Sequence, residues 1–152
     1  MQIPEGQGLW PAFWLMGNNF ATVGWPICGE LDVMEHVNAP LPDYVLGSAH
    51  VLNYNSSHQY VSSTSLGAGF HIYGMIWKPG VVQMYVDSTN NIYAQYDKAT
   101  VVASGGTWPF DSGNAAFIFL NLSVGGTLPG NPNGSTPFPS QLLVDWVRFY
   151  TN

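Results

Sequence analysis

Hydrophobic and polar residues alternate along much of this chain with the period of two that is typical of β-strands. No stretch shows the period of an amphipathic helix of useful length. Seven segments combine this pattern with β-branched and aromatic residues and are predicted to be strands: Leu31–Val37, Val45–Leu52, His71–Trp77, Val81–Val86, Asn91–Tyr96, Ala116–Val124 and Leu142–Tyr150.

Turn-forming residues separate the predicted strands, as in Lys78-Pro79-Gly80 and Ser104-Gly105-Gly106. The Pro/Gly-rich stretch Thr127–Ser140 lies between two predicted strands and is interpreted as a long ordered loop. No internal repeat or linker is found. We therefore expect one all-β domain over residues 1–152, built as a two-sheet sandwich or a barrel.

The charge balance excludes several classes of partner. The net charge is −6, and only Lys78, Lys98 and Arg148 are basic. Nucleic acids and anionic membrane surfaces need clustered Lys and Arg, so neither is an expected partner. A neutral sugar is compatible with this balance. The six Trp, eight Tyr and eight Phe exceed what a small core needs, so some of them are expected to contact ligand.

A single cysteine, Cys28, allows no intrachain disulfide and no multi-cysteine metal site. Nearby carboxylates disfavour a thiolate, so Cys28 is interpreted as a small buried residue. The sequence shows neither a signal peptide nor an apolar run of about 18 residues that would span a membrane. Residues Met1–Pro4 read as the tail of a strand, so the chain is interpreted as starting within a longer protein.

Three of the nine acidic residues fall within the short stretch Glu30–Glu35. On a regular strand Glu30 and Asp32 share a face, and Glu35 falls on the opposite one. One extra residue at Val33-Met34, accommodated as a β-bulge, would bring Glu35 back beside them. Repulsion between the three groups would raise at least one pKa, giving a proton donor beside an ionised nucleophile.

Two carboxyl groups at the spacing that one strand supplies are typical of a retaining glycosidase. The other interpretations are a solvated acidic face or a calcium site. A solvated face usually interleaves Lys or Arg, and none is nearby; a strand is also a poor calcium loop. On the residues alone, catalytic and non-catalytic readings stay open.

The stretch Glu30-Leu31-Asp32-Val33-Met34-Glu35 resembles the signature E-x-D-x-x-E of family-16 glycoside hydrolases, in its bulged, laminarinase-type form. Three further segments support the resemblance: Gly8–Gly17 is similar to the family's G-x-W-P-A-F-W, Phe119–Gly126 to L-N-x-A-V-G-G, and Leu143–Tyr150 to its last strand. The resemblance implies a concanavalin-like β-jelly-roll sandwich of two antiparallel sheets, and a secreted enzyme that cleaves β-1,3 or mixed β-1,3/1,4 glucan internally, with retention.

The resemblance also implies roles for individual residues: Glu30 as nucleophile, Asp32 as its partner and Glu35 as acid/base. No metal or cofactor is expected at the catalytic residues. Asp145 matches one contributor to a structural calcium site, whose other ligands would be missing. Strands that usually precede the G-x-W-P-A-F-W segment are absent, so we expect a sandwich truncated at its N-terminus, with exposed apolar edges that favour self-association.

Aromatic platforms and polar side chains complete the expected sugar site, because the C–H faces of sugars stack on flat rings. The candidates for substrate contact are Trp10, Trp14, Trp25, His50 and Asn121. His50 has a second interpretation as a structural histidine, and Asn121 as an ordinary strand residue. The alternative functions are a carbohydrate-binding or inactive domain of the same fold, or a galactan hydrolase such as an agarase or carrageenase; a sulfated substrate would need a basic cleft.

Overall fold

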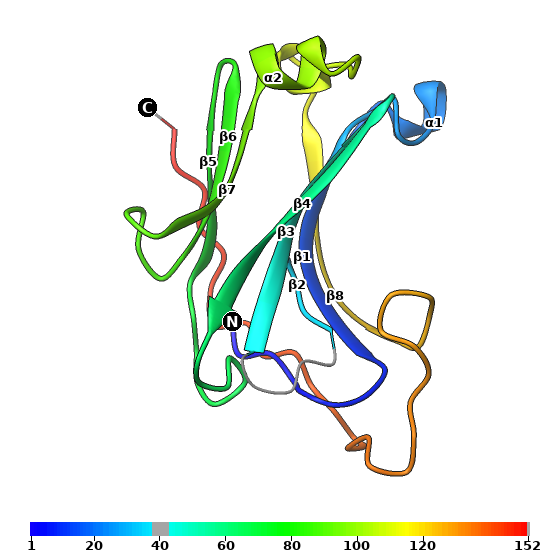
Figure 1. Cartoon of the computed structure of the whole chain (residues 1–152), viewed down its shortest axis with the longest axis vertical. Coiled ribbons are helices and arrows are strands. Elements are labelled where there is room, and N and C mark those ends of the chain that lie inside the picture. Colours follow the sequence, from blue (N-terminus) through cyan, green and yellow to red (C-terminus); the bar gives the residue numbers. More distant parts are fainter. Residues whose placement is uncertain (38–42, 152) are drawn as a thin grey trace.

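The computed structural model describes residues 1–37 and 43–151 and contains two antiparallel sheets that face each other (Figure 1). The larger sheet has the order β4-β3-β2-β1-β8, formed by β1 (Leu9–Gly17), β2 (Glu30–Glu35), β3 (Asp43–Val51), β4 (Tyr54–Ser62) and β8 (Ala116–Val124). The smaller sheet has the order β5-β6-β7, formed by β5 (Tyr73–Lys78), β6 (Val81–Val86) and β7 (Ile92–Asp97). The predicted all-β sandwich of two antiparallel sheets is confirmed.

Helical structure is confined to short connections. These are α1 (Phe20–Val23), α2 (Lys98–Ala103) and the 3-10 turn η1 (Pro109–Asp111). None of the helices in the described part of the chain is long and apolar enough to cross a membrane.

The core lies between the two sheets and consists of two clusters of apolar side chains. One cluster contains Ile3, Met34, Val45, Leu66, Tyr73 and Val86, and the other contains Leu31, Ala49, Val82, Met84, Ala94 and Tyr96. Alternate residues of β6 (Val82, Met84 and Val86) are fully buried, as the period-two pattern requires. Burial of apolar surface on one face of each sheet thus leaves the opposite faces free for other roles.

Strand β2 carries the predicted β-bulge. Asp32 pairs with Ser48 of β3, and Glu35 pairs with Leu46, so three steps along β2 match two steps along β3. Val33 and Met34 are both fully buried inside this irregularity. The extra residue therefore returns Glu35 to the face that Glu30 and Asp32 occupy, as the sequence predicted.

The predicted strands Val81–Val86 and Ala116–Val124 are confirmed with their bounds, whereas β1 and β4 were not predicted. The predicted strand Leu142–Tyr150 is wrong: within the described residues this segment makes one isolated bridge, between Gln2 and Leu143. An alternating pattern supplies strand propensity, but a strand forms only where a neighbouring backbone offers hydrogen bonds along its length.

Apolar side chains remain exposed beside β8, the last strand of the larger sheet. Among the described residues β8 pairs only with β1. Ile118 pairs with the buried Leu15 and so faces the other sheet, yet it is 47% exposed. Away from β8, the C-terminal segment that runs beside β5 (Figure 1) carries Phe149 and Tyr150, which are 83% and 77% exposed. The expected exposure of apolar edges is therefore present.

Candidate active site

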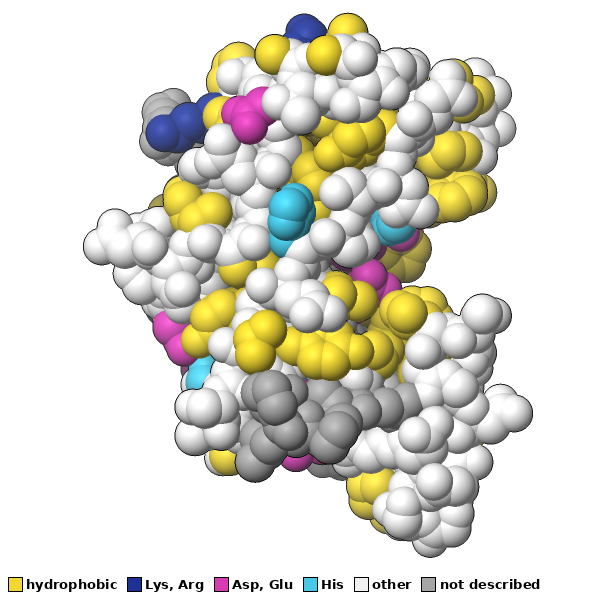
Figure 2. Space-filling view, in the orientation of Figure 1, with side chains coloured by type: hydrophobic (Ala, Val, Ile, Leu, Met, Phe, Trp, Pro, Cys, Tyr) yellow, Lys and Arg dark blue, Asp and Glu magenta, His cyan; other side chains and the backbone are white. Residues whose placement is uncertain are grey.

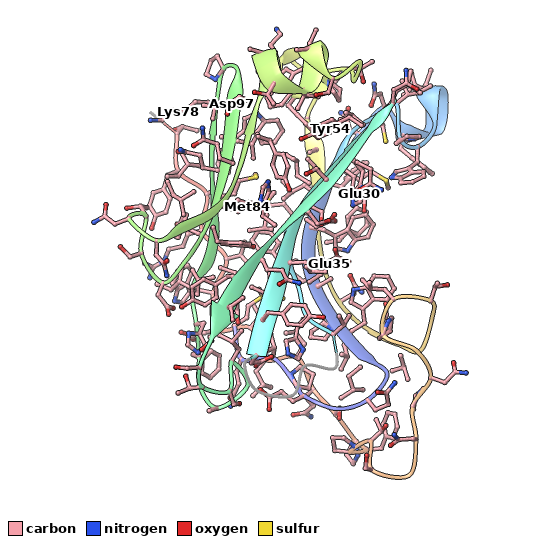
Figure 3. The ribbon with its side chains drawn as sticks, viewed as in Figure 1. Glu30, Glu35, Tyr54, Lys78, Met84 and Asp97 are labelled. Atoms are coloured by element: carbon pink, nitrogen blue, oxygen red, sulfur yellow. The ribbon has the colours of Figure 1, made fainter. Side chains whose placement is uncertain are left out.

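The three acidic residues of β2 line the face of the larger sheet that points away from the core. Figure 2 shows the molecule hollowed on the right, between α1 and the loop that follows β8, with acidic and histidine side chains inside the hollow. Glu30 and Glu35 point into this hollow from β2 (Figure 3). Strand pairing sets their neighbours in rows: Met16, Glu30 and His50; Trp14, Asp32 and Ser48; Ala12, Glu35 and Leu46.

Glu30 is half-buried at the start of β2, where its carboxylate accepts a hydrogen bond from the indole nitrogen of Trp25. Trp25 itself is 54% exposed, and its ring centroid lies 6.3 Å from that of His50. One face of the Trp25 ring is thus available near a carboxylate that it orients. An oriented, partly exposed carboxylate is suited to nucleophilic attack.

Asp32 lies beside Glu30 and is only 2% exposed. Its Oδ2 atom is 2.9 Å from Nε2 of His50 on β3. Burial and the charge of Glu30 raise the pKa of Asp32 to about 6, although the His50 imidazole favours the ionised form. Burial lowers the pKa of His50, but the neighbouring carboxylates of Asp32, Glu30 and Glu35 outweigh this effect and raise it. The carboxyl group of Asp32 and the imidazole of His50 therefore form a close pair in which each group favours the charged form of the other.

Glu35 occupies the other end of β2, and Nε1 of Trp10 donates a 3.0 Å hydrogen bond to its Oε1 atom. Burial and the charge of Asp32 raise the pKa of Glu35 to about 7, while Trp10, His50 and Ser48 oppose this shift. A carboxyl group with such a pKa is protonated in a large fraction of molecules near neutral pH. Glu35 is thus suited to donate a proton.

Trp14 and Asn121 extend the site across β1 and β8. Nε1 of Trp14 donates a 2.7 Å hydrogen bond to Oδ1 of Asn121, whose Nδ2 donates to Oγ of Ser123 at 3.0 Å. The Trp14 ring stacks on Phe119 with centroids 4.3 Å apart. Asn121 pairs with Ala12, which pairs with Glu35, so this network lies in the same part of the sheet as the carboxyl groups.

Seven of the eight predicted site residues thus lie on one face of one sheet, and the eighth, Trp25, reaches Glu30 from the turn between α1 and β2. The catalytic and substrate-binding roles of the individual residues stay predictions. Sequence reasoning missed Ser48, which is 1% exposed and pairs with Asp32, and Tyr93 of β7, whose hydroxyl donates to the carbonyl oxygen of Val33 at the bulge. A Ser or Tyr in a strand has no distinguishing signal; only the register of the sheets shows what it supports.

The expected calcium contributor, Asp145, lies in the exposed C-terminal segment. Among the described residues it belongs to no cluster of three or more ligating His, Cys, Asp or Glu side chains. Calcium at Asp145 therefore stays a prediction, and no step of the chemistry is assigned to it.

The amino-acid sequence is similar to those of known glycoside hydrolases. Residues 1–65 match the family described as "XgeA-like, catalytic GH16 domain". A β-glucanase from Rhodothermus marinus is 33% identical over 98% of this chain, and a keratan-sulfate endo-1,4-β-galactosidase from Sphingobacterium multivorum is 38% identical over 96%. The chain spans 54% of the first relative's length and 34% of the second's.

The fold gives the same result. The structure of an endo-β-1,3-glucanase from Pyrococcus furiosus superposes on 91% of this chain with a TM-score of 0.85 and 39% sequence identity, and the match covers 54% of that protein. Agreement in sequence and in fold extends over nearly all of the present chain and includes the strand that carries the three carboxyl groups. The chain belongs to glycoside hydrolase family 16 and resembles its laminarinase-type members.

Proposed function

We propose that this chain carries the catalytic residues of a retaining endo-β-glucanase that cleaves β-1,3 or mixed β-1,3/1,4 glucan. The main supporting observation is that two carboxyl groups on the same strand, β2, have different surroundings. Glu30 is oriented by Trp25 at the hollow, whereas Glu35 is held by Trp10 and has a pKa raised to about 7 by burial and by Asp32. A retaining glycosidase needs this division between a nucleophile and an acid.

In the proposed reaction, the carboxylate of Glu30 attacks the anomeric carbon while Glu35 protonates the departing glycosidic oxygen. The bond to the leaving sugar breaks, and a glycosyl ester to Glu30 forms. Glu35, now ionised, takes a proton from water, and this water displaces Glu30 with a second inversion. Asp32, between them on the same face, holds the charge state of Glu30.

Three observations support a neutral glucan as substrate. The hollow contains indole rings on which sugar faces can stack, from Trp10, Trp14 and Trp25. The relatives named as a β-glucanase and an endo-β-1,3-glucanase are 33% and 39% identical to this chain. Lys78 and the other basic side chains lie elsewhere: Lys98 pairs with Asp111, Arg148 stacks over Trp146, and Lys78 lies far from Glu30 and Glu35 (Figure 3).

A galactan hydrolase is the second candidate, because the keratan-sulfate endo-1,4-β-galactosidase is 38% identical to this chain. Sulfate groups are usually recognised by Arg or Lys. None of the three basic side chains, Lys78, Lys98 and Arg148, lies in the hollow. Neutral glucan is therefore favoured over a sulfated galactan. Since polysaccharides are too large to enter cells freely, we propose that the enzyme acts outside the cell.

The decisive experiment measures reducing-sugar release from laminarin, barley mixed-linkage glucan, agarose and keratan sulfate, with Glu30→Gln as the comparison. Release from laminarin that vanishes in the variant is the expected result. Release from keratan sulfate alone would favour the second candidate. Folded protein without release from any substrate would contradict catalysis by this chain and favour a binding role.

A chemical test separates the two roles. With an activated aryl glucoside and added azide, Glu30→Ala should give the α-glucosyl azide, because azide attacks directly in place of the missing nucleophile. Glu35→Ala should give the β-glucosyl azide, because azide then intercepts the ester on Glu30. The opposite stereochemistry, analysed by NMR, would reverse the assignment.

A further inference from the structure

Three ligand-type side chains meet in the hollow. One carboxylate oxygen each from Glu30 and Asp32 and one ring nitrogen of His50 lie within 4.8 Å of one another. The set is carried by two paired strands, in which Glu30 is directly opposite His50. Nitrogen and oxygen donors in this combination suit Zn²⁺ and similar divalent transition metals, whereas Ca²⁺ prefers oxygen alone.

The most buried member of this set lacks a well-aligned hydrogen-bond donor. Asp32 is 2% exposed, and its Oδ2 atom is completely buried. Although Nε2 of His50 is 2.9 Å away, no aligned N–H···O hydrogen bond reaches this oxygen. Its pairing with His50 is therefore close but poorly aligned, and a cation coordinated by both the carboxylate oxygen and the imidazole nitrogen would satisfy the buried oxygen better.

The charges around the set also favour a cation. Glu30, Asp32 and Glu35 lie on one face, and the charges of Glu30 and Glu35 both act on His50. None of the three basic residues of the chain lies among them. Like charges in a poorly solvated place repel, and a divalent ion would relieve that repulsion.

We propose that Glu30, Asp32 and His50 bind a divalent transition-metal ion such as Zn²⁺, and that the bound ion inhibits the chain by occupying the carboxylate of Glu30. The inhibitory clause rests on the proposed function; the binding clause does not. Three protein ligands leave a fourth position for water, facing the hollow. Nδ1 of His50 is buried without a hydrogen-bond partner, so the imidazole lacks the outer support typical of tight sites. The affinity is therefore weak, and the ion is an inhibitor rather than a resident cofactor.

The test uses Co²⁺ as a probe, because its visible absorption reports coordination without any need for activity. Co²⁺ titrated into the wild-type chain should bind at a 1:1 ratio and be displaced by Zn²⁺. His50→Ala should weaken binding by about tenfold or more. The matched control is His71→Ala, since His71 is paired with Asp87 beside the other sheet. Cys28→Ser tests whether the buried thiol supplies a ligand instead.

Loss of binding in His50→Ala, with His71→Ala and Cys28→Ser unchanged, supports the site. Equal affinity in wild type and His50→Ala, or loss in Cys28→Ser, overturns it. Should His50→Ala fail to fold, Glu30→Gln provides the same test, because Glu30 is half-buried at the hollow and outside the core. Zn²⁺ should also inhibit laminarin hydrolysis competitively. If the chain is active and binds Co²⁺ at this site but its activity is insensitive to Zn²⁺, the proposed inhibition is refuted. If the chain is inactive, the Co²⁺ titration alone decides whether the metal site exists.

Discussion

At the scale of single residues, the site depends on two glutamates of β2 that experience different surroundings. Glu30 borders the open hollow and accepts a hydrogen bond from an exposed indole, while Glu35 is more enclosed and lies beside the buried Asp32. The sequence predicted that these groups share a face, because the spacing and the extra residue allow it. The spacing alone did not predict which of them would have the raised pKa, since that depends on burial by residues distant in the sequence; only the family resemblance assigned the acid to Glu35.

The first prediction concerns Glu30. Glu30→Gln keeps the size of the side chain and its ability to accept the Trp25 hydrogen bond, but it removes the nucleophile. Turnover of laminarin should fall by at least about 10³-fold while glucan binding persists. Initial rates and binding by isothermal titration calorimetry would measure the two effects. Asp97→Asn, at the C-terminal end of β7 and away from the hollow, is the control and should retain activity; loss of glucan binding in Glu30→Gln would indicate a structural defect instead.

The second prediction concerns the pH dependence of hydrolysis. Glu35 must be protonated to act as the acid, and burial together with Asp32 raises its pKa to about 7. Activity should therefore decline as the pH rises through about 7. A substrate whose leaving group needs no protonation should lose this decline and should also be least affected by Glu35→Gln. An alkaline decline that persists with such a substrate would assign the titration to another group.

The third prediction concerns stability. The pKa of Glu35 is raised above its ordinary value of 4.5 to about 7, so the folded chain holds a proton that the unfolded chain releases. This proton favours the folded state below the ordinary pKa, and the contribution is lost as the pH rises through about 7. Between pH 5 and pH 8, urea unfolding should show about 2 kcal/mol more loss of stability in wild type than in Glu35→Gln. Equal pH dependence in both proteins would contradict the shift.

At the scale of elements, sequence patterns succeeded where a strand is buried on one face. The alternation Val82, Met84, Val86 predicts β6, and a largely apolar sequence, interrupted only by Asn121 and Ser123, predicts the bounds of β8. Strand β4 was missed because Asn55-Ser56-Ser57 is polar, and its pairing to β3 rather than its composition makes it a strand. The bulge in β2 was predicted because only an extra residue reconciles three carboxylates with one face. The hydrogen bond that Tyr93 of the other sheet donates to this bulge was not predicted.

The fourth prediction tests that support. The Tyr93 hydroxyl donates to the Val33 carbonyl oxygen, which lies inside the bulge where the ladder with β3 is interrupted. Tyr93→Phe leaves a buried carbonyl without this donor, which should cost about 1–3 kcal/mol in the free energy of unfolding. If the bulge then relaxes, Glu35 moves and kcat falls more than KM rises. Tyr60→Phe is the matched control, because it removes a hydroxyl from the ring that packs edge-on against Tyr93 at 6.1 Å; equal losses in both variants would show that the hydrogen bond to Val33 is not the cause.

At the scale of the whole molecule, the face with the proposed catalytic residues and an exposed apolar edge occur in the same sandwich. The five-stranded sheet presents the hollow on one side, and its other side is covered by a sheet of only three strands. The C-terminal segment resembled a last strand in sequence yet forms one bridge, to Gln2. Its sequence was informative about family but not about pairing, because pairing depends on a free neighbouring backbone that no local pattern reveals.

The fifth prediction follows from that edge. Strand β8 has nine residues without a charge, Gly or Pro, so nothing in it opposes pairing with another strand. Two copies can pair β8 with β8 in antiparallel fashion and also cover Ile118. The chain should therefore associate as its concentration rises, seen as an increasing sedimentation coefficient. Ile118→Lys should keep it monomeric, because pairing would then bury a charge. Lys substituted for the exposed Val102 of α2, away from this edge, should leave association unchanged; a wild-type chain that stays monomeric at about 100 µM, above the Kd of ordinary weak dimers, would refute the prediction.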